Sequence, residues 1–334
     1  MATGVIGWGF YVPDKVLTNS DLEKIVDTSD EWITTRTGIK ERRIAPVDMA
    51  VSGMAFEASK KALKKANLTP TDVDLIITAT ITPDMFFPSA SCFVQAKLGA
   101  GNAACFDISA ACSGFIYALK VAMSLIESGS YRNALVIGVE KLTAITDWED
   151  RNTCVLFGDG AGAVVLGAVE NGGIRSSYLG ADGTKADLLN MPGGGSLNPA
   201  THETVDKKMH YVKMKGNELF KYAVRLMANA ALEALKKAGL DKSDIKYLIP
   251  HQANSRIIWA TARKLGLNEE QVFVNIHRYG NMSSASCAVA LCEVLELKDI
   301  KAGDKLLLAS FGGGLTWGAS VIEVSEQREV NSEQ

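Results

Sequence analysis

The amino-acid sequence predicts a layered α/β fold that is built from two similar halves. The segment ALKKANLTPTDVDLIITA, which begins at Ala62, returns as ALKKAGLDKSDIKYLIPH from Ala234, about half the chain later. A second pair, FGDGAGAVVLGAV from Phe157 and FGGGLTWGASVIEV from Phe311, follows in the same order. Two matches in one order favour a duplication over chance. The halves should therefore be related by a pseudo-twofold axis.

Each copy of the first repeat is typical of an amphipathic helix, a turn and an apolar strand. Asn67 and Gly239 stand where the C-terminus of a helix favours a left-handed residue. Further strands are expected from Ala104, Asn133, Val272 and Lys305. All are nearly continuous apolar runs, which indicates sheets covered by helices on both faces. The turn-like Glu170–Gly173 segment predicts a boundary near residue 172, which gives halves 1–172 and 173–334.

Composition excludes several classes of protein. The chain has 334 residues, of which 47% are hydrophobic and 22% charged, as in ordinary globular proteins. The net charge of −3 gives no basic excess that would point to nucleic acid. We expect neither a membrane span nor a signal peptide, and hence a cytoplasmic protein with reduced thiols. The six cysteines form no pattern of metal-ligand spacing, so no metal site is expected.

Cys112 is the strongest candidate for a nucleophile. It lies in DISAACSGF, where an apolar strand ends and a helix begins, among small neighbours that would let a substrate approach. A helix N-terminus favours a thiolate and should lower the pKa of this thiol. Cys287, which also follows small residues at the start of a helix, is the nearest rival.

A nucleophilic thiol needs partner groups. His251 and His277 both follow predicted strands, and the rim of a layered sheet is where α/β proteins form their sites. Asn281 precedes a helix, so it is either an N-cap or an amide that points into the site. The stretch from Gly183 to Lys208 is rich in Gly, Pro and polar residues and is expected to be a surface loop or a lid.

These motifs together resemble a known family. Cys112 in DISAACSGF, His251 in HQAN, Asn281 in GNMSSAS, the tail FGGGLTWG and the segment TSDEWITTRTGIKERR are similar to those of the β-ketoacyl-acyl carrier protein synthase III family. The resemblance runs from residue 2 to about residue 324. It implies the thiolase fold, with five layers αβαβα, and a homodimer. It also implies the condensation that initiates fatty acid synthesis, without a metal or bound cofactor.

The resemblance also implies roles for individual residues. Cys112 would take an acyl group from acyl-CoA, and the backbone N–H groups of Cys112 and Gly313 would stabilise the oxyanion. His251 and Asn281 would donate hydrogen bonds to the enolate that forms when malonyl-acyl carrier protein loses carbon dioxide. Elongating ketoacyl synthases are set aside because they use Cys, His and His, whereas the third of these positions is Asn281 here. Biosynthetic thiolases are set aside because they use a second cysteine late in the chain, and no cysteine follows Cys292.

The same family match extends to the substrate channel. The positions that would bind CoA or line its channel are Trp32, Arg36, Thr37, Arg151, Phe220 and Asn254. Phe87 would reach the acyl pocket of the partner subunit. Basic residues cluster near this channel, and Lys221 and Arg256 are expected to help dock the acidic carrier protein through electrostatic steering.

Two alternatives remain open from the sequence. One is a priming acyltransferase or condensing enzyme of a polyketide or quinolone pathway, which shares the three site residues but uses another acyl donor. The other is a catalytically silent binding protein on the same fold, although Cys112, His251 and Asn281 are all present. The preferred length and branching of the primer are left undetermined, because acyl starters differ only by methylene groups.

Overall fold

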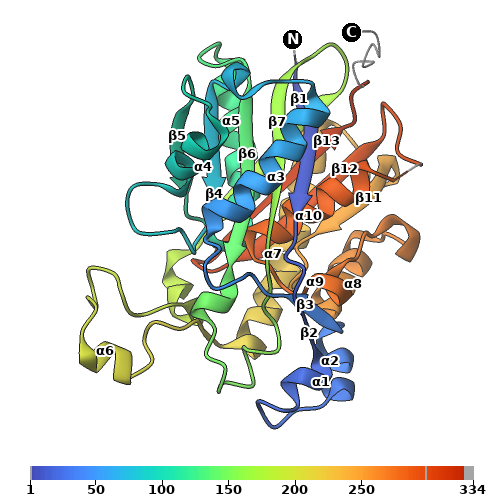
Figure 1. Cartoon of the computed structure of the whole chain (residues 1–334). Helices are drawn as coiled ribbons and strands as arrows, with labels where there is room; N and C mark the ends of the chain where they lie inside the picture. Colours follow the sequence, from blue (N-terminus) through green and yellow to red (C-terminus); the bar gives the residue numbers. More distant parts are fainter. Residues whose placement is uncertain (1, 298, 327–334) are drawn as a thin grey trace.

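The computed structural model describes residues 2–297 and 299–326. Residues 1, 298 and 327–334, which include the outer ends of the two predicted halves, lie outside the described residues. Two main sheets form the body of the molecule (Figure 1). The first contains β1 (Ala2–Tyr11), β7 (Asp159–Val169), β6 (Ala134–Lys141), β4 (Leu75–Ala79) and β5 (Ala104–Ile108), in that spatial order. Strand β4 pairs in parallel with β5 and β6, whereas β7 pairs antiparallel with β1 and β6.

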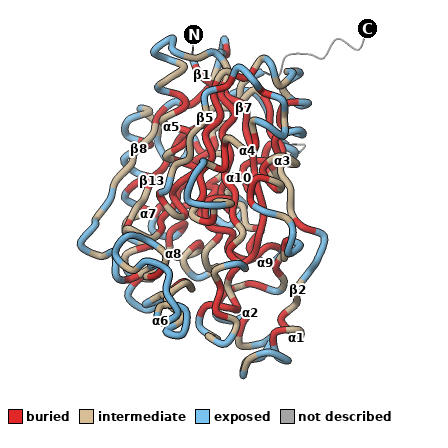
Figure 2. Tube along the Cα trace, turned by 60° about the vertical axis from the view of Figure 1, so that its left-hand side comes forward, coloured by how far each residue is buried: buried red, intermediate tan, exposed pale blue. Residues whose placement is uncertain are grey.

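The second sheet repeats this arrangement with one strand fewer. Its order is β8 (Gly173–Ala181), β13 (Thr316–Glu323), β12 (Lys305–Gly312) and β11 (Ile245–Pro250). Strands β11 and β12 are parallel, and β13 is antiparallel to both of its neighbours. The apolar strands of both sheets are buried along most of their length, as Figure 2 shows in red.

One strand expected from the sequence does not form. From Val272 the chain makes a single bridge to Leu248 and then enters α9 (Ile276–Tyr279). The reason is a side chain: Gln252 Oε1 accepts the N–H groups of Asn275 and Ile276, which turns the backbone away from a ladder.

Helices fill the three remaining layers. Between the sheets lie α5 (Gly114–Glu127) and α10 (Ser284–Leu295), and both contact strands of each sheet. The outer face of the first sheet is covered by α3 (Val51–Ala66) and α4 (Ala90–Leu98). The outer face of the second sheet is covered by α7 (Gly216–Ala238), against which α8 (Ser255–Leu265) packs. The five predicted layers αβαβα are therefore confirmed.

The helix ends follow the sequence closely. Asn67 caps the C-terminus of α3 and Gly239 that of α7, each with a positive φ (54° and 68°), as the left-handed termination predicts. Helix α10 is buried on all sides, which explains why its sequence SASCAVALCEVL shows little amphipathic pattern.

Shorter elements gather at one end of the sheets (Figure 1). They are β2 (Val16–Thr18), α1 (Asn19–Leu22), α2 (Asp30–Thr37), β3 (Glu41–Arg43), β9 (Leu189–Asn190), α6 (His202–Asp206) and β10 (Lys213–Met214). The predicted loop from Gly183 to Lys208 contains α6 and a strand, β9, that pairs with β10. Much of it is exposed, and it projects from the body in Figure 2.

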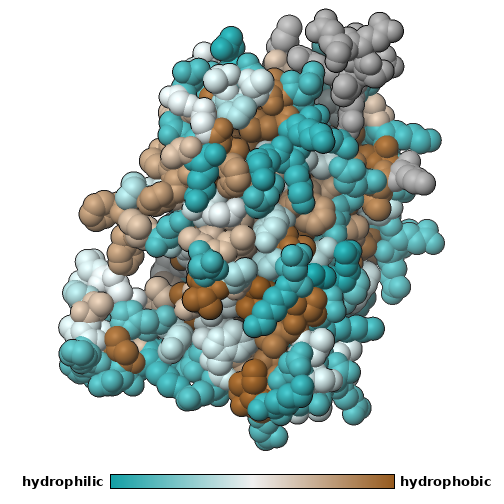
Figure 3. Space-filling view, in the orientation of Figure 1, coloured by the Kyte–Doolittle hydropathy of each residue, from teal (hydrophilic) through white to brown (hydrophobic). Residues whose placement is uncertain are grey.

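The face in Figure 3 carries many hydrophilic residues, with hydrophobic residues in smaller groups between them. Among the helices of the described residues, none combines the length and apolar character needed to cross a bilayer.

The contact between α10 and the first sheet depends on glycine. A Cβ added at Gly162 of β7 would stand 2.5 Å from the carbonyl carbon of Ala288, which is backbone and cannot move aside. We predict that Gly162→Ala lowers the free energy of unfolding by about 2–3 kcal/mol, because the central layer becomes overpacked. Urea denaturation measures this. Gly101→Ala is the control, since a Cβ there meets nothing within 4 Å. Equal urea concentrations at the midpoint of unfolding for the two variants would contradict the prediction.

Candidate active site

A single cavity of about 570 Å³ brings together most of the residues singled out in the sequence. Cys112, His251 and Asn281 line it, although they come from three separate segments of the chain. It is also lined by Trp32, Arg36, Thr37, Phe220, Lys221, Asn254, Arg256 and Gly312. Gly313, Arg151 and Phe87 are not part of its lining. This convergence makes the cavity the candidate active site.

Cys112 lies in a 3-10 turn (Ala111–Ser113) that leads directly into α5. The second sheet holds this turn in place. Ser310 Oγ on β12 donates to the carbonyl of Cys112 at 2.7 Å. Gly312 packs so closely that a Cβ there would stand 2.6 Å from the Cys112 nitrogen. The segment that carries the sulfur therefore belongs to the first half of the chain but is fixed by the second.

Burial determines the ionisation of Cys112. Its side chain is only 8% exposed, and desolvation raises the pKa of the thiol to about 12. The nearby Ser283 side chain opposes the rise, and the negative charge of an ionised Glu140 adds to it. The expected lowering by the helix N-terminus is therefore wrong for the free protein, because desolvation of the thiolate is the larger effect. The thiol is neutral at pH 7.

Cys287 was the rival nucleophile. It is fully buried, and burial raises its pKa to about 12 as well. Its Sγ faces the carbonyl of Ala309, and it does not line the cavity. Of the cysteines in the described residues, Cys112 is the one that the cavity reaches.

His251 follows β11 directly, and its backbone N–H donates to the backbone carbonyl of Ala309 at 2.8 Å. The residue is 2% exposed, and burial lowers the pKa of its imidazole to about 3. The ring is therefore neutral and carries one N–H donor. Within residues 2–297 and 299–326, Nδ1 has no hydrogen-bond partner. His277, the other histidine expected to follow a strand, lies in α9 instead and is outside the cavity lining.

Asn281 is not the N-cap of α10, since that position belongs to Ser283. Its backbone is held on both sides by the first half: its N–H donates to Leu156, and its carbonyl accepts from Gly158. Its side-chain oxygen accepts the N–H of Ser283 at 2.8 Å. With the oxygen fixed in this way, the NH₂ group of the carboxamide is the part left to donate into the cavity.

One part of the cavity wall is built around the aromatic ring of Trp32. The guanidinium of Arg151 lies 4.4 Å from the centre of the Trp32 ring, and that of Arg36 lies 4.9 Å from it. Thr37 is buried, with its hydroxyl donating to Ile33.

Asn254 and Phe220 also line the cavity. The Asn254 side chain caps α8 through the N–H of Arg256 and donates to the carbonyl of Arg36 at 2.9 Å. It therefore joins α8 to the end of α2. The Arg256 guanidinium lies 5.5 Å from the centre of the Phe220 ring. Phe87, in contrast, is 83% exposed in the single chain, next to the equally prominent Phe86.

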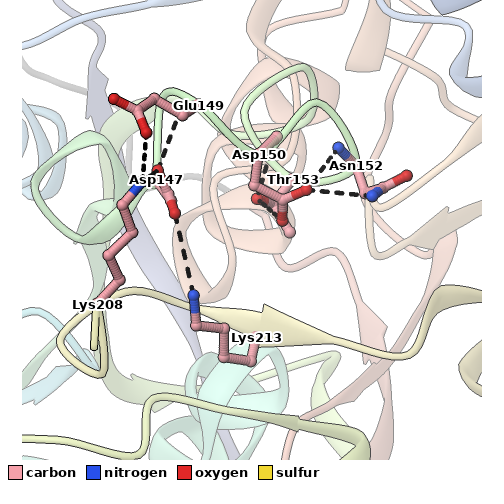
Figure 4. A network of polar contacts seen from close by, with 7 residues as sticks. All are labelled: Asp147, Glu149, Asp150, Asn152, Thr153, Lys208 and Lys213. Atoms are coloured by element: carbon pink, nitrogen blue, oxygen red, sulfur yellow. Dashed lines mark hydrogen bonds and ion pairs between the residues drawn. The ribbon is translucent and has the colours of Figure 1, made fainter. Parts of the chain in front are cut away.

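Ion pairs divide the basic residues near the cavity into two groups. Lys207, Lys208, Lys213 and Lys215 each pair with a carboxylate. Figure 4 shows Lys208 and Lys213 converging on Asp147, which attaches the 183–214 segment to the loop that precedes β7. Within the described residues, Lys221 and Arg256 form no ion pair. These two cations are therefore available at the cavity.

Sequence reasoning missed the residues that support the site. Ser283, Ser310 and Gly312 surround the Cys112 turn, and Glu140 lies behind it. The triple glycine was the one available signal, since a run of glycines marks a close approach of backbone. No group of three or more His, Cys, Asp or Glu side chains in the described part of the chain could hold a metal ion.

Comparison with known proteins identifies the family. Residues 106–183 match the family model described as 3-oxoacyl-[acyl-carrier-protein (ACP)] synthase III, and residues 235–324 match the model of its C-terminal part. A curated β-ketoacyl-[acyl-carrier-protein] synthase III from Caldanaerobacter subterraneus subsp. tengcongensis is 59% identical over 98% of this chain and 99% of its own length.

Solved structures agree with this result. The crystal structure of 3-oxoacyl-[acyl-carrier-protein] synthase III from Aquifex aeolicus VF5 is 53% identical, with a TM-score of 0.90 over 97% of this chain and 100% of that one. The priming β-ketosynthase from the R1128 polyketide biosynthetic pathway is 36% identical, with a TM-score of 0.91 over 98% of this chain and 97% of that one. The chain belongs to the 3-oxoacyl-[acyl-carrier-protein] synthase III family.

Proposed function

We propose that this protein condenses a short acyl-CoA with malonyl-acyl carrier protein, with loss of carbon dioxide, to give the β-ketoacyl-carrier protein that initiates fatty acid synthesis. The observation that carries the proposal is the convergence of Cys112, His251 and Asn281 on one cavity. A thiol suits covalent capture of the acyl group, and two neutral donors suit the carbanion step that follows. The reaction uses thioester chemistry throughout and needs no bound metal or redox cofactor.

In the first half-reaction, Cys112 Sγ attacks the thioester carbonyl of acyl-CoA. The new bond is an S–acyl bond, and CoA leaves with the proton of the thiol. The developing oxyanion would be stabilised by the N–H groups of Cys112 and Gly313. In support, the Gly313 N–H has no acceptor within the described residues. Because the free thiol is neutral, ionisation must accompany substrate binding or attack.

In the second half-reaction, the thioester oxygen of the malonyl group gains negative charge as carbon dioxide leaves. His251 and Asn281 would donate hydrogen bonds to this oxygen. Burial keeps the imidazole neutral, so it adds no permanent charge that would also bind the ground state. The carbanion then attacks the acyl-Cys112 carbonyl, the carbon–sulfur bond breaks, and the cysteine recovers a proton.

The wider assignment follows from the same reaction. CoA would extend along Thr37, Phe220 and Asn254 toward Trp32, Arg36 and Arg151. We propose a division into two halves near residue 172 and a homodimer in which the exposed Phe87 enters the acyl pocket of the second subunit. A cytoplasmic location suits a reaction that depends on a reduced thiol.

A priming condensing enzyme of a polyketide pathway is the second candidate. The observation in its favour is the close structural match to the R1128 priming synthase, although the identity with that protein is lower. The two candidates share all three site residues and differ in the acyl donor that they accept.

The first prediction concerns Asn281. Wild-type protein should become acylated by acetyl-CoA and should form product with malonyl-carrier protein. Asn281→Ala should keep the acylation rate but lose decarboxylation by on the order of 100-fold, because one preorganised donor is missing. Separate assays of acyl-enzyme formation and of carbon dioxide release measure this. Equal losses in both half-reactions would contradict the assigned role. Absence of product with wild type would contradict the function itself.

The second prediction concerns carrier-protein docking. Arg256 lines the cavity and has no ion pair in the described chain, so its charge is available to an acidic partner. Arg256→Glu should lower kcat/KM for malonyl-carrier protein about tenfold at low salt, and added salt should narrow the difference. Lys207→Glu is the matched control, because Lys207 is already paired with Glu203. A rate that Arg256→Glu leaves unchanged at low salt would exclude this docking role.

A further inference from the structure

A carboxyl group is buried directly behind the proposed nucleophile, and the reaction outlined above makes no use of it. Glu140, near the end of β6, has no solvent exposure. Alternate residues of β6 face opposite sides of the sheet. Gly138 abuts Ser284 of α10, so Glu140, two residues later, faces the same central layer. Within the described residues it has no cationic partner.

The carboxyl joins two segments of the site. On one side it accepts the hydroxyls of Thr82 at 2.6 Å and Thr80 at 3.1 Å, and the N–H of Ile81. These residues follow β4 and lead to the loop that carries Phe87. On the other side, Glu140 Oε1 lies 3.0 Å from the hydroxyl of Ser284, the first residue of α10. Asn281 and Ser283 come immediately before that helix.

The hydrogen bonds at Ser284 point to a protonated acid. The Ser284 hydroxyl lies 2.8 Å from the carbonyl of Ala79 and 3.0 Å from Glu140 Oε1, and both of these oxygens are acceptors if Glu140 is ionised. One hydroxyl has a single proton and cannot satisfy both. A proton on Oε1 resolves the conflict, because Glu140 then donates to Ser284, which donates to Ala79. Oε2 still accepts the hydroxyls of Thr80 and Thr82, and the Ile81 N–H, 3.1 Å from Oε2 and 3.2 Å from Oε1, is shared between the two oxygens.

Burial favours the same protonation state. Desolvation raises the pKa of Glu140 to about 7, although the hydrogen bonds from Thr82, Ile81, Ser284 and Thr80 oppose the rise. A carboxyl whose pKa is raised keeps its proton to higher pH, so Glu140 reaches half ionisation only near neutral pH. The uncharged form is therefore the one present below that pH.

Few titratable groups face this carboxyl. Cys112, in the turn before α5, is the one that it influences, because an ionised Glu140 raises the pKa of that thiol. Lys141 on the same strand extends to the carbonyls of Pro46 and Met49 instead. Asp159 on β7 binds Thr143 and Ala45. On α10, Cys287 is directed to Ala309.

We propose that Glu140 is a positioning residue that works in its protonated form: its O–H donates to Ser284 and fixes the start of α10, and with it Asn281, against the Cys112 turn. Ionisation would remove this donor and place an uncompensated negative charge behind the sulfur. The inference rests on the proposed roles of Cys112 and Asn281. Glu140 would not touch the substrate, but it would govern the position of Asn281 and the charge next to Cys112.

Glu140→Gln separates this role from a need for a carboxylate, because the amide is neutral and can both donate and accept. In acylated wild-type protein, where the thiol no longer titrates, the rate of malonyl decarboxylation should fall by about tenfold or more between pH 7 and pH 9. Glu140→Gln should keep the rate at pH 7 within about threefold and should lack the alkaline fall. Glu140→Leu, which cannot donate, should lose decarboxylation at every pH.

A second readout does not depend on the condensation. The pH profile for alkylation of Cys112 by iodoacetamide, followed by peptide mass spectrometry, should shift to lower pH in Glu140→Gln, since the thiol then ionises without a neighbouring carboxylate. Asp159→Asn is the control: it removes another fully buried carboxyl from the adjacent strand and should leave both the alkaline fall and the alkylation profile in place.

Two results would overturn the proposal. One is a folded Glu140→Gln protein that loses more than about thirtyfold of its activity at pH 7, which would show that the carboxylate is required. The other is an alkaline fall that persists unchanged in Glu140→Gln. Failure of the proposed function is distinguishable from either, because it would appear as a wild-type protein without acylation or decarboxylation at any pH.

Discussion

The contact between the Cys112 turn and the end of β12 is the constraint on which the site depends. Gly312 lies against the backbone of Cys112, and Ser310 binds its carbonyl. His251 follows β11, the parallel neighbour of β12, so the same sheet positions both the turn and the imidazole. The backbone of Asn281 is in turn hydrogen-bonded to Leu156 and Gly158 of the first half. Neither half of the chain contains a complete site, so the site depends on the contact between the two halves.

Burial then decides the charges of that site. The same desolvation that raises the pKa of Cys112 to about 12 lowers that of His251 to about 3 and raises that of Glu140 to about 7. Near neutral pH the free site holds a thiol, an uncharged imidazole and a carboxyl that still carries its proton in about half of the molecules. Such a site stabilises negative charge only where the reacting thioester develops it, which favours the transition state over the ground state. The free energy needed to ionise the sulfur must come from the bound substrate.

Local patterns in the sequence predicted much of this arrangement. The repeat at Ala62 and Ala234 indicated the duplicated layers, and the small residues around Cys112 indicated a turn at the start of a helix. Contacts between residues that are distant in sequence could not be predicted in this way. The pKa of Cys112 depends on what covers it, and the strand expected at Val272 is replaced because Gln252, far away in sequence, takes its N–H groups. Lys208 forms an ion pair with Glu149, whereas Arg256 lies over the Phe220 ring and keeps its charge free for a partner. This difference depends on neighbours that only the fold brings close.

The central claim is that the sulfur of Cys112, although neutral in the free protein, accepts the acyl group. The most direct test is intact-mass spectrometry of the full-length protein after incubation with acetyl-CoA, followed by peptide mapping. We expect one acetyl group, located on the peptide that contains Cys112, in wild type and in Cys287→Ser, and no adduct in Cys112→Ser. An adduct that survives in Cys112→Ser, or a wild-type protein that is not acylated by any short acyl-CoA, would contradict the account.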